Sequence, residues 1–447
     1  MSAWRVLIVA AVLAGLYQTE AKARDPQTYP LAEAVQPGDC FRVRLDMSLD
    51  GEMTVQRGDK PAKLPLKAAA AHEYPERVLS VGKDGVPDKA ARVYETARAT
   101  ITVARDSSER TLRDDRRLIV AQRHKDQPLV YSPAGALTRA ELDLTSDHFD
   151  TLAVVGLLPG KAVAVGDTWK IPTGVAQALC NFEGVTEQTL SGKLDEVKDG
   201  VAQFTVSGTS SGVDQGSLVK LEITAKGRFD LKAKRLTALE WTQKDQRDAG
   251  PVSPATAVTT TVALKRTPIE RPEKLSDVAL VSVPDGFAPP APLTHLELRD
   301  GKGRYELLHP REWQMVSATE NHQVLRLMDR GDFVAQATIT PWTAAEKGQH
   351  LSPDAFKEAM YGSPGFELTK ELQADEVPSE QKGRWVYRLS ALGELDGVEV
   401  LQNCYLIAAP GGEQVVVTFT LTPKQADKLG ARDLSFVGGL EVPAAKK

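Results

Sequence analysis

The chain has 447 residues, of which 42% are hydrophobic and 26% charged, and its formal net charge is −5 at pH 7. A mildly acidic chain without a basic patch does not attract nucleic acid, so we expect no nucleic-acid partner. After the N-terminal segment no apolar run reaches the ~18 residues that a membrane-spanning helix needs, and we expect no transmembrane segment in the mature chain. At roughly 150 residues per domain, this length favours two or three domains.

Residues 1–23 have the pattern of a secretory signal peptide. A single cationic side chain precedes an apolar run at 6–16, which is too short for a stable membrane anchor. Ala21 and Ala23 supply the small residues that a signal peptidase requires. We therefore predict cleavage before Arg24 and an exported protein, either periplasmic or secreted.

The three cysteines are too few for a disulfide scaffold in a chain of this size. In an oxidising compartment Cys40 and Cys180 could form one bridge, which would stabilise the fold by up to ~5 kcal/mol. Burial as unpaired core residues is the alternative for this pair. Burial is also the expectation for Cys404, which lies in the strand-like run Val398–Ile407.

From residue 24 to 264 the sequence alternates between apolar and polar residues, which is typical of half-buried β-strands. We expect one large antiparallel sheet and leave open a division into two subdomains near residue 160. After the first run, Asp50-Gly51 predicts a hairpin whose three-residue loop ends at Glu52, with Leu49 opposite Met53. The clearest alternating runs are Phe41–Leu49, Ala99–Val103, Ala202–Val206, Val219–Ile223 and Val258–Leu264.

Two segments of this region have helical character. Pro87–Thr96 is rich in charge and alanine, and Ser146–Leu157 opens with residues that cap helices well. Further on, Pro159–Trp169 contains a turn that leads Trp169 into the next strand. This last stretch resembles exported bacterial β-rich proteins, and the resemblance implies no activity.

Residues 265–293 contain six prolines and little periodicity, which predicts a linker or a connector held against a domain. Beyond it, a helix framed by Ser352 as N-cap and Gly362 at its end divides two groups of strands. A last helix begins at Thr422 and ends at Gly430. The expected strands are Tyr305–Leu308, Val324–Met328, Phe333–Thr340, Trp385–Ala391, Val398–Ile407 and Gln414–Thr420.

The order of these elements, with His309-Pro-Arg-Glu-Trp313 on the early strands, resembles the PsbP-like fold across residues 294–443. The resemblance implies an antiparallel sheet sandwiched by helices, and a role in binding or assembly. No ligand residues of the family match this chain. We therefore predict a mainly β, α+β protein, with a large antiparallel β-rich region at 24–264 and an α/β/α sandwich at 294–447.

The segment Gly208-Thr-Ser-Ser-Gly212 fits the Gly-x-Ser-x-Gly formula of a serine-hydrolase nucleophile elbow, with Ser210 as the nucleophile. An elbow needs a helix directly after the serine, whereas the alternating run Val219–Ile223 indicates a strand. The sequence therefore favours a hairpin loop with a solvated Ser210.

A short acidic cluster contains residue types that bind metal ions, namely Asp143, Asp147, His148 and Asp150. Acidic residues at a helix start also satisfy free backbone amides, and helical spacing does not place this cluster on one face. We expect capping.

Two further motifs have simple interpretations. His72-Glu73 lacks the second histidine of a zinc-binding helix, and we expect a surface pair. Arg113–Arg117 mixes acids with bases, which favours a solvated hairpin tip over an anion site. The sequence thus assigns no catalytic residue, no metal ligand and no cofactor.

The leading hypothesis is an exported, non-enzymatic protein that binds a partner or supports assembly in the cell envelope. A carrier of a lipid or other apolar small molecule is a variant, because large curved sheets can enclose such ligands. The competing class is a hydrolase with an unrecognised site at Ser210 or around Asp147. An internal apolar cavity would favour the carrier, whereas histidine and carboxylate groups converging in a cleft would favour the enzyme.

Overall fold

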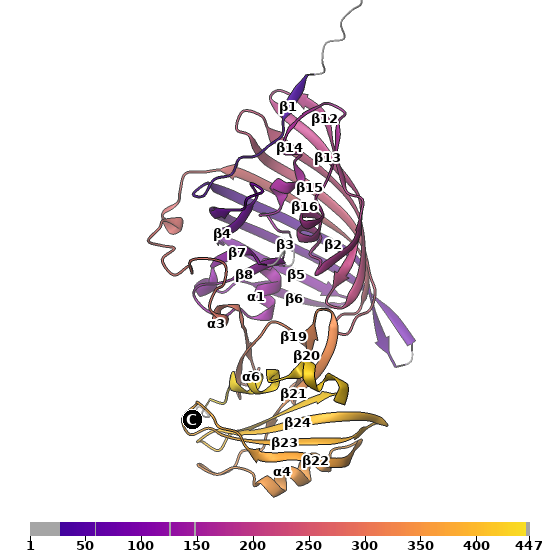
Figure 1. Ribbon diagram of the computed structural model, residues 1–447, viewed down its shortest axis with the longest axis vertical. Coiled ribbons are helices and arrows are strands. Elements are labelled where there is room, and N and C mark those ends of the chain that lie inside the picture. Colours follow the sequence, from indigo (N-terminus) through magenta and orange to yellow (C-terminus); the bar gives the residue numbers. More distant parts are fainter. Residues whose placement is uncertain (1–26, 59, 125–126, 147–148, 444–447) are drawn as a thin grey trace, which may run out of the picture.

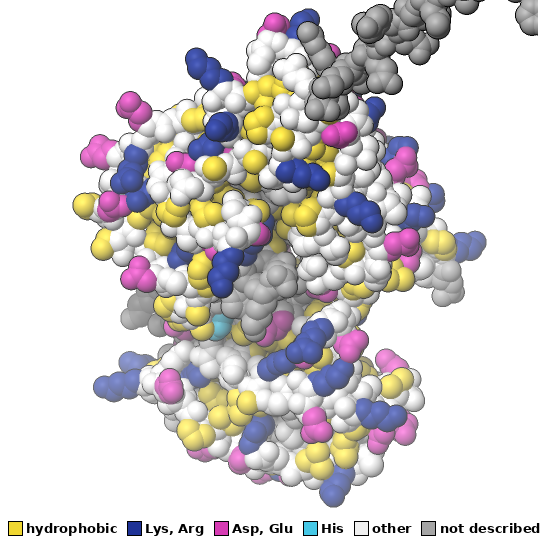
Figure 2. All heavy atoms as spheres, turned by 45° about the horizontal axis from the view of Figure 1, so that its top comes forward, with side chains coloured by type: hydrophobic (Ala, Val, Ile, Leu, Met, Phe, Trp, Pro, Cys, Tyr) yellow, Lys and Arg dark blue, Asp and Glu magenta, His cyan; other side chains and the backbone are white. Residues whose placement is uncertain are grey.

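The computed structural model describes residues 27–58, 60–124, 127–146 and 149–443. The expected signal peptide and its cleavage site lie outside these residues. The described chain forms a large N-terminal domain and a smaller C-terminal domain, which are stacked along the long axis of the molecule (Figure 1). Charged side chains of both signs are interspersed over the visible face of both domains (Figure 2).

The N-terminal domain is built on an antiparallel sheet of 14 described strands. The main path runs β10-β12-β13-β14-β15-β16-β2-β3-β4-β7-β8, with β11 on β13 and the β5-β6 hairpin on β3. These strands are β2 (Cys40–Arg57), β3 (Lys60–Val81), β4 (Pro87–Val93), β5 (Thr96–Val103), β6 (Asp106–Thr111), β7 (Leu118–His124), β8 (Gln127–Tyr131), β10 (Thr168–Lys170), β11 (Gly184–Gln188), β12 (Ser191–Lys198), β13 (Val201–Asp214), β14 (Ser217–Asp230), β15 (Arg235–Arg247) and β16 (Ala255–Pro268).

Alternation along the strands gives this sheet one apolar face. In β14, residues 217 to 229 alternate strictly between buried and exposed. Because successive side chains point to opposite faces of a strand, this pattern places one face on the core and the other in water. The large antiparallel sheet predicted from the sequence is confirmed.

The inner, concave face of the sheet is covered by the segment between β8 and β11. It contains α1 (Arg139–Ser146), the 3-10 turn η2 (Val154–Leu157), α2 (Thr173–Cys180) and β9 (Ala162–Ala164), which pairs with β1 (Thr28–Pro30). Side chains of this segment and of the sheet share one buried apolar cluster. Figure 1 shows the sheet curving around these elements.

The hairpin predicted at Asp50-Gly51 is wrong, because β2 continues through it to Arg57. Leu49 pairs with Ala68 of β3 and with Thr260 of β16, not with Met53. A Cβ atom at Gly51 would overlap the carbonyl oxygen of residue 257 in the neighbouring strand. The glycine therefore permits the close approach of β16 and does not mark a turn.

The helix predicted at Pro87–Thr96 is also wrong, because this segment forms β4 and the start of β5. β4 pairs with β3 on one side and with β7 on the other. Most of its residues are buried, so the apolar alternation that identifies a strand is missing. Sheet pairing overrides the helix propensity of its alanines.

The helix predicted at Ser146–Leu157 lies one segment earlier in the structure. α1 ends at Ser146, and only the short turn η2 follows, at the end of the expected range. Of the acidic cluster, Asp147 and His148 lie outside the described residues. Trp169 enters β10 as predicted, and its ring is buried in the core.

The proline-rich segment is a connector packed on the N-terminal domain, and its first four residues belong to β16. It contains η3 (Glu273–Leu275) and α3 (Ala291–Thr294). Leu275 and Leu280 are buried against β4 at Ala91. Lys89 Nζ donates to two connector carbonyls, each at 2.6 Å. Of the two sequence-based alternatives, the structure has the connector held against a domain.

The C-terminal domain contains a seven-stranded antiparallel sheet in the order β19-β20-β21-β25-β24-β23-β22, and beside it a small sheet, β17-β18-β26. Its strands are β17 (Leu296–Arg299), β18 (Glu306–His309), β19 (Trp313–Ala318), β20 (Gln323–Asp329), β21 (Asp332–Trp342), β22 (Phe366–Glu376), β23 (Trp385–Leu395), β24 (Val398–Ala408), β25 (Gln414–Leu421) and β26 (Leu440–Glu441).

Helices cover both faces of this sheet, as the family resemblance implied. α4 (Pro353–Tyr361) begins after Ser352, whose Oγ accepts from Ala355 N, and packs on one face. The turn η4 (Pro423–Gln425), α5 (Ala426–Leu429) and α6 (Arg432–Gly438) lie on the other, where Phe436 is fully buried. The mainly β, α+β fold class is confirmed. No helix among the described residues combines the length and the apolar character needed to span a bilayer.

Candidate binding cavity

A cavity of about 360 Å³ lies between the concave face of the large sheet and helices α1 and α2. Small-molecule sites typically have volumes of ~300–1,000 Å³. The apolar wall comes from strands β2, β3, β5 and β16 and from the two helices, and consists of Met47, Leu49, Leu66, Ala68, Ala70, Ala99, Ile101, Leu144, Leu179 and Val262. Most of the rest of the lining is polar, so the cavity has an apolar wall and a polar part.

Strand register sets the shape of this wall. Met47 of β2 lies opposite Ala70 of β3 and Val262 of β16, and Ala70 lies opposite Ala99 of β5. Side chains of residues paired across an antiparallel sheet share a face, so these four form one row on the inner surface. Alanines at two of the four positions leave room that larger side chains would fill.

One end of the cavity is polar. Gln243, Asp245 and Arg247 occupy alternate positions of β15 and therefore share its inner face. Arg247 forms an ion pair with Asp214 of β13. Trp241 Nε1 donates to Gln243 Oε1 at 2.9 Å, so the amide nitrogen of Gln243 stays available to a ligand.

Asp245 is the least satisfied of these polar residues. Its Oδ1 atom is buried and has no hydrogen-bond partner. Desolvation raises the pKa of Asp245 to about 6, although the nearby Arg247 guanidinium acts in the opposite direction. A buried carboxylate oxygen without a partner is costly, which marks this position as a candidate ligand contact.

All three cysteines are free and buried, so the bridge considered between Cys40 and Cys180 is not formed. Cys180, at the end of α2, lines the cavity together with Asp245 of β15. Asp245 pairs with Val258 of β16, which pairs with Gly51 of β2, so this part of the cavity lies on the side of the sheet where Gly51 is found. Gly51 is eleven residues from Cys40 along β2, a distance of about 36 Å at ~3.3 Å per residue. A disulfide needs Cα atoms within about 7 Å. Burial raises the pKa of the Cys180 thiol to about 12.

Ser210 lies in the middle of β13, so the predicted solvated hairpin loop is wrong. It is only 1% exposed, and the strand continues to Asp214 where a nucleophile elbow would need a helix. The two glycines of the motif have a packing role. A Cβ at Gly208 would lie 2.7 Å from Thr189 O, and one at Gly212 would lie 2.6 Å from Gly184 O. They let β11 and the residues after it approach β13.

The two described residues of the acidic cluster, Asp143 and Asp150, are each placed beside an arginine. Asp143 forms an ion pair with Arg110 at 3.0 Å. Asp150 lies 3.8 Å from Arg92, whose Nε donates to Glu76 Oε2 at 2.9 Å in the core. The described residues contain no group of three or more histidine, cysteine, aspartate or glutamate side chains that could hold a metal ion.

His72 does not form the expected surface pair. It is buried, and its ring packs edge-on against Tyr94 with a centroid distance of 5.6 Å. Its neighbour Glu73 points to the other face of β3 and pairs with Arg42 at 3.1 Å. Alternation along a strand separates the two side chains, which sequence adjacency had suggested would act together.

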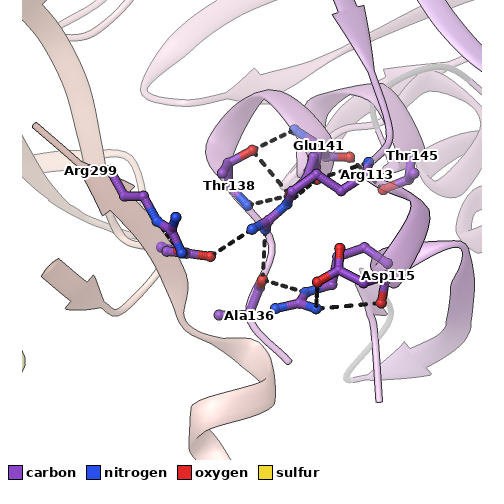
Figure 3. Close-up of polar contacts among 9 residues, drawn as sticks. Arg113, Asp115, Ala136, Thr138, Glu141, Thr145 and Arg299 are labelled. Atoms are coloured by element: carbon purple, nitrogen blue, oxygen red, sulfur yellow. Dashed lines mark hydrogen bonds and ion pairs between the residues drawn. The ribbon is translucent and has the colours of Figure 1, made fainter. Parts of the chain in front are cut away.

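Arg113 lies at the interface between the two domains, so the predicted solvated tip is wrong for this residue, whereas Asp114 and Asp115 of the same segment are exposed. Its Nε donates to Glu141 Oε1 of α1 at 2.6 Å, and its Nη1 donates to Glu297 Oε2 of β17 at 3.0 Å (Figure 3). Glu297 N also donates to Leu137 O at 2.8 Å. Leu296, the neighbour of Glu297, is buried in the apolar cluster of the N-terminal domain. The side chains and the backbone together fix the interface.

Comparisons with protein-family models and with curated proteins each found no match. Among solved structures, one match is CyanoP from Synechocystis, a cyanobacterial PsbP, which is 12% identical in sequence. The match covers 36% of this chain and 99% of the CyanoP chain, with a TM-score of 0.27. The Ran-binding protein Mog1p of Saccharomyces cerevisiae is 12% identical, covers 34% of this chain and 96% of its own, and has a TM-score of 0.26.

A lipovitellin structure is 8% identical, covers 53% of this chain and 26% of its own, and has a TM-score of 0.28. The CyanoP match agrees with the PsbP-like resemblance in part of the chain. The expected likeness of the N-terminal region to exported bacterial proteins stays a prediction. At these identities and scores the likenesses carry no argument about function.

Proposed function

We propose that this chain is an exported binding protein that carries a lipid or another apolar small molecule in the cavity of its N-terminal domain. The observation that supports this most directly is the apolar wall contributed by four strands and two helices. Protein interiors are normally packed as densely as organic crystals. An opening of about 360 Å³ in such a wall is therefore best explained as space for a ligand.

Filling the cavity tests this proposal. Ala68→Leu combined with Ala70→Leu would place two larger side chains in the wall. We expect titration calorimetry with dodecanol to show binding to the wild-type chain and about tenfold or greater weakening in the variant, because lost apolar burial lowers affinity. Ala257→Leu is the matched control, since Ala257 is exposed on the outer face of β16. Unchanged affinity in the filled variant would refute the proposal.

Export is a part of the proposal that rests on the pattern of residues 1–23. We expect N-terminal sequencing of the native protein to begin at or near Arg24. We also expect the protein in the extracytoplasmic fraction. Mature native protein that still begins at Met1 would contradict export.

Binding of an envelope protein and hydrolysis are the competing functions. Affinity purification from the native envelope fraction, with identification of co-purifying lipids and proteins, distinguishes binding of an envelope protein from transport of an apolar ligand. A stoichiometric protein partner without any lipid would favour a role in assembly. Ester hydrolysis by the purified chain that is lost in Ser210→Ala would favour the hydrolase.

A further inference from the structure

The polar end of the cavity has an excess of negative charge. Asp214 and Asp245 line it directly. Two cationic side chains line the cavity among the described residues, and both are already paired, Arg247 with Asp214 and Arg110 of β6 with Asp143. Asp245 is the lining carboxylate that keeps a buried oxygen without a partner among the described residues, so a ligand group placed here meets an uncompensated carboxylate.

Helix α2 gives a second, independent reason why the polar end of the cavity favours a positively charged ligand group. Its last residue, Cys180, and its C-cap, Asn181, line the same end of the cavity. The C-terminal end of a helix carries a partial negative charge, and in α2 backbone N–H groups of Asn181 and Phe182 donate to two of the last carbonyls, those of residues 178 and 177. The helix end and the carboxylates therefore favour the same sign of ligand charge.

The free Oδ1 atom of Asp245 supplies a specific contact. It is buried in the lining of the cavity, and no donor from the described residues reaches it. Gln243 stands two residues away on the same face with its amide nitrogen available. A ligand that donates hydrogen bonds at one end and is apolar beyond it would satisfy both parts of the cavity.

We propose that the ligand is a single-chain amphiphile with a protonated amine head group, which binds Asp245 while its chain lies along Met47, Ala68 and Ile101. This inference rests on the proposed carrier function and specifies its ligand class. A carboxylate or phosphate head would be repelled by Asp245 and would place an acceptor against its free Oδ1 atom. An uncharged alcohol would gain the chain contacts without the ionic one.

Three probes with the same chain separate these cases. Dodecylamine, dodecanol and dodecanoate are titrated into the wild-type chain at pH 8, below their micelle concentrations. We expect dodecylamine to bind about tenfold more tightly than dodecanol, because hydrogen bonds to charged groups are the stronger ones, and dodecanoate to bind most weakly. Dodecanoate binding as tightly as dodecylamine would overturn the head-group assignment.

A variant tests the role of Asp245 itself. Asp245→Asn keeps the shape and removes the charge, and we expect it to weaken dodecylamine about tenfold while dodecanol changes less than about threefold. Glu240→Gln is the control, because it removes a carboxylate from the exposed face of the same strand. Amine affinity that Asp245→Asn leaves unchanged would also overturn the assignment.

The two proposals fail in different ways. If none of the three probes binds the wild-type chain, the carrier function and the ligand class are both wrong. If dodecanol binds but the amine has no advantage, only the ligand class is wrong. The ranking of the probes on the wild-type chain does not depend on whether any variant folds.

Discussion

Asp245 gives the N-terminal domain a specific pH dependence. Its pKa is about 6 in the folded protein, above its ordinary value of 3.8, and Arg247, Asp214 and Cys180 are the titratable groups around it. Below the unfolded pKa the carboxyl is protonated in both states and burial is not penalised. As the pH rises toward the folded pKa the unfolded state ionises first, so the free energy of unfolding falls by up to about 1.4 kcal/mol per pH unit.

We expect Asp245→Asn to remove this decline. Urea denaturation at pH values from 4 to 7 should give the wild-type chain a steeper loss of stability with rising pH than the variant. The difference between the two chains isolates this residue from the other titrating groups. Identical slopes would show that Asp245 ionises in the folded state as readily as in the unfolded one.

Gly51 is the residue at which the packing of β2 against β16 depends on a missing side chain. Gly51→Ala would force a Cβ atom against backbone of β16, which cannot move without shifting the central sheet. We expect a loss of about 1–3 kcal/mol in the free energy of unfolding. Gly174→Ala is the control, since its Cβ would meet nothing within 4 Å. Equal stability of the two variants would contradict this account.

At the scale of elements, the connector between the domains is held by apolar and polar contacts with the N-terminal domain. Leu275 and Leu280 bury its apolar contacts, and Lys89 holds the carbonyl oxygens of residues 284 and 286. We expect Leu275→Asp with Leu280→Asp to release the segment, because a buried charge without a partner is strongly unfavourable. Limited proteolysis should then cut within residues 270–290 in the variant and leave the wild-type connector intact.

A surface substitution in the same segment controls for charge alone. Val281 is 84% exposed, so Val281→Asp adds a carboxylate without losing buried contacts. It should leave the connector as resistant as in the wild-type chain. Rapid cleavage of the wild-type connector would mean that its packing does not protect the backbone.

The sequence predicted the elements whose surroundings are simple. β14 is apolar on one face and exposed on the other, so its alternation was sufficient. α4 has local signals at both ends, in Ser352 and Gly362. β4 failed because the connector covers its outer face and both sides of the strand are buried. Its pattern depends on residues almost 200 positions away, which no local reading can supply.

The cavity could be inferred only as a general consequence of a curved sheet. Its wall combines Met47 with Val262 and Ala70 with Ala99, and these pairings follow from strand register. Asp245 had no distinguishing sequence signal, because a lone carboxylate in an alternating strand usually points to solvent. The sequence contained one indication that Asp245 points to the core. Trp241 and Asp245 are four residues apart in β15 and therefore share a face of the strand.

At the scale of the whole molecule, Arg113 is one of the side chains that link the two domains directly. It binds Glu141 and Glu297, whose side chains are 4% and 14% exposed. Arg113→Met would leave Glu141 without its arginine and remove one of the two arginines that contact Glu297. Breaking a buried ion pair costs about 3–5 kcal/mol, and we expect the lower part of that range because Arg113 itself is 33% exposed.

Calorimetry distinguishes a loss at the interface from a general loss of stability. We expect the unfolding of Arg113→Met to separate into two transitions as the domains uncouple. Arg299→Met is the control, because Arg299 contacts the same Glu297 from a position that is 60% exposed. One cooperative transition at the wild-type temperature would show that the domains do not depend on Arg113.

The pairing of β2 with β16 has a consequence for how the chain reaches its native state. Ser48 and Thr261 are neighbours in the sheet but 213 positions apart in the chain. During synthesis the β2-β3 hairpin is therefore complete long before β16, the other partner of β2, exists, and the backbone edge of β2 stays unpaired. Contacts between residues that lie far apart in the sequence slow folding, and the intermediates that wait for them are prone to aggregate. The cavity wall can close only after residue 268 has emerged, so a chain interrupted before that point lacks the complete cavity and has a strong tendency to aggregate.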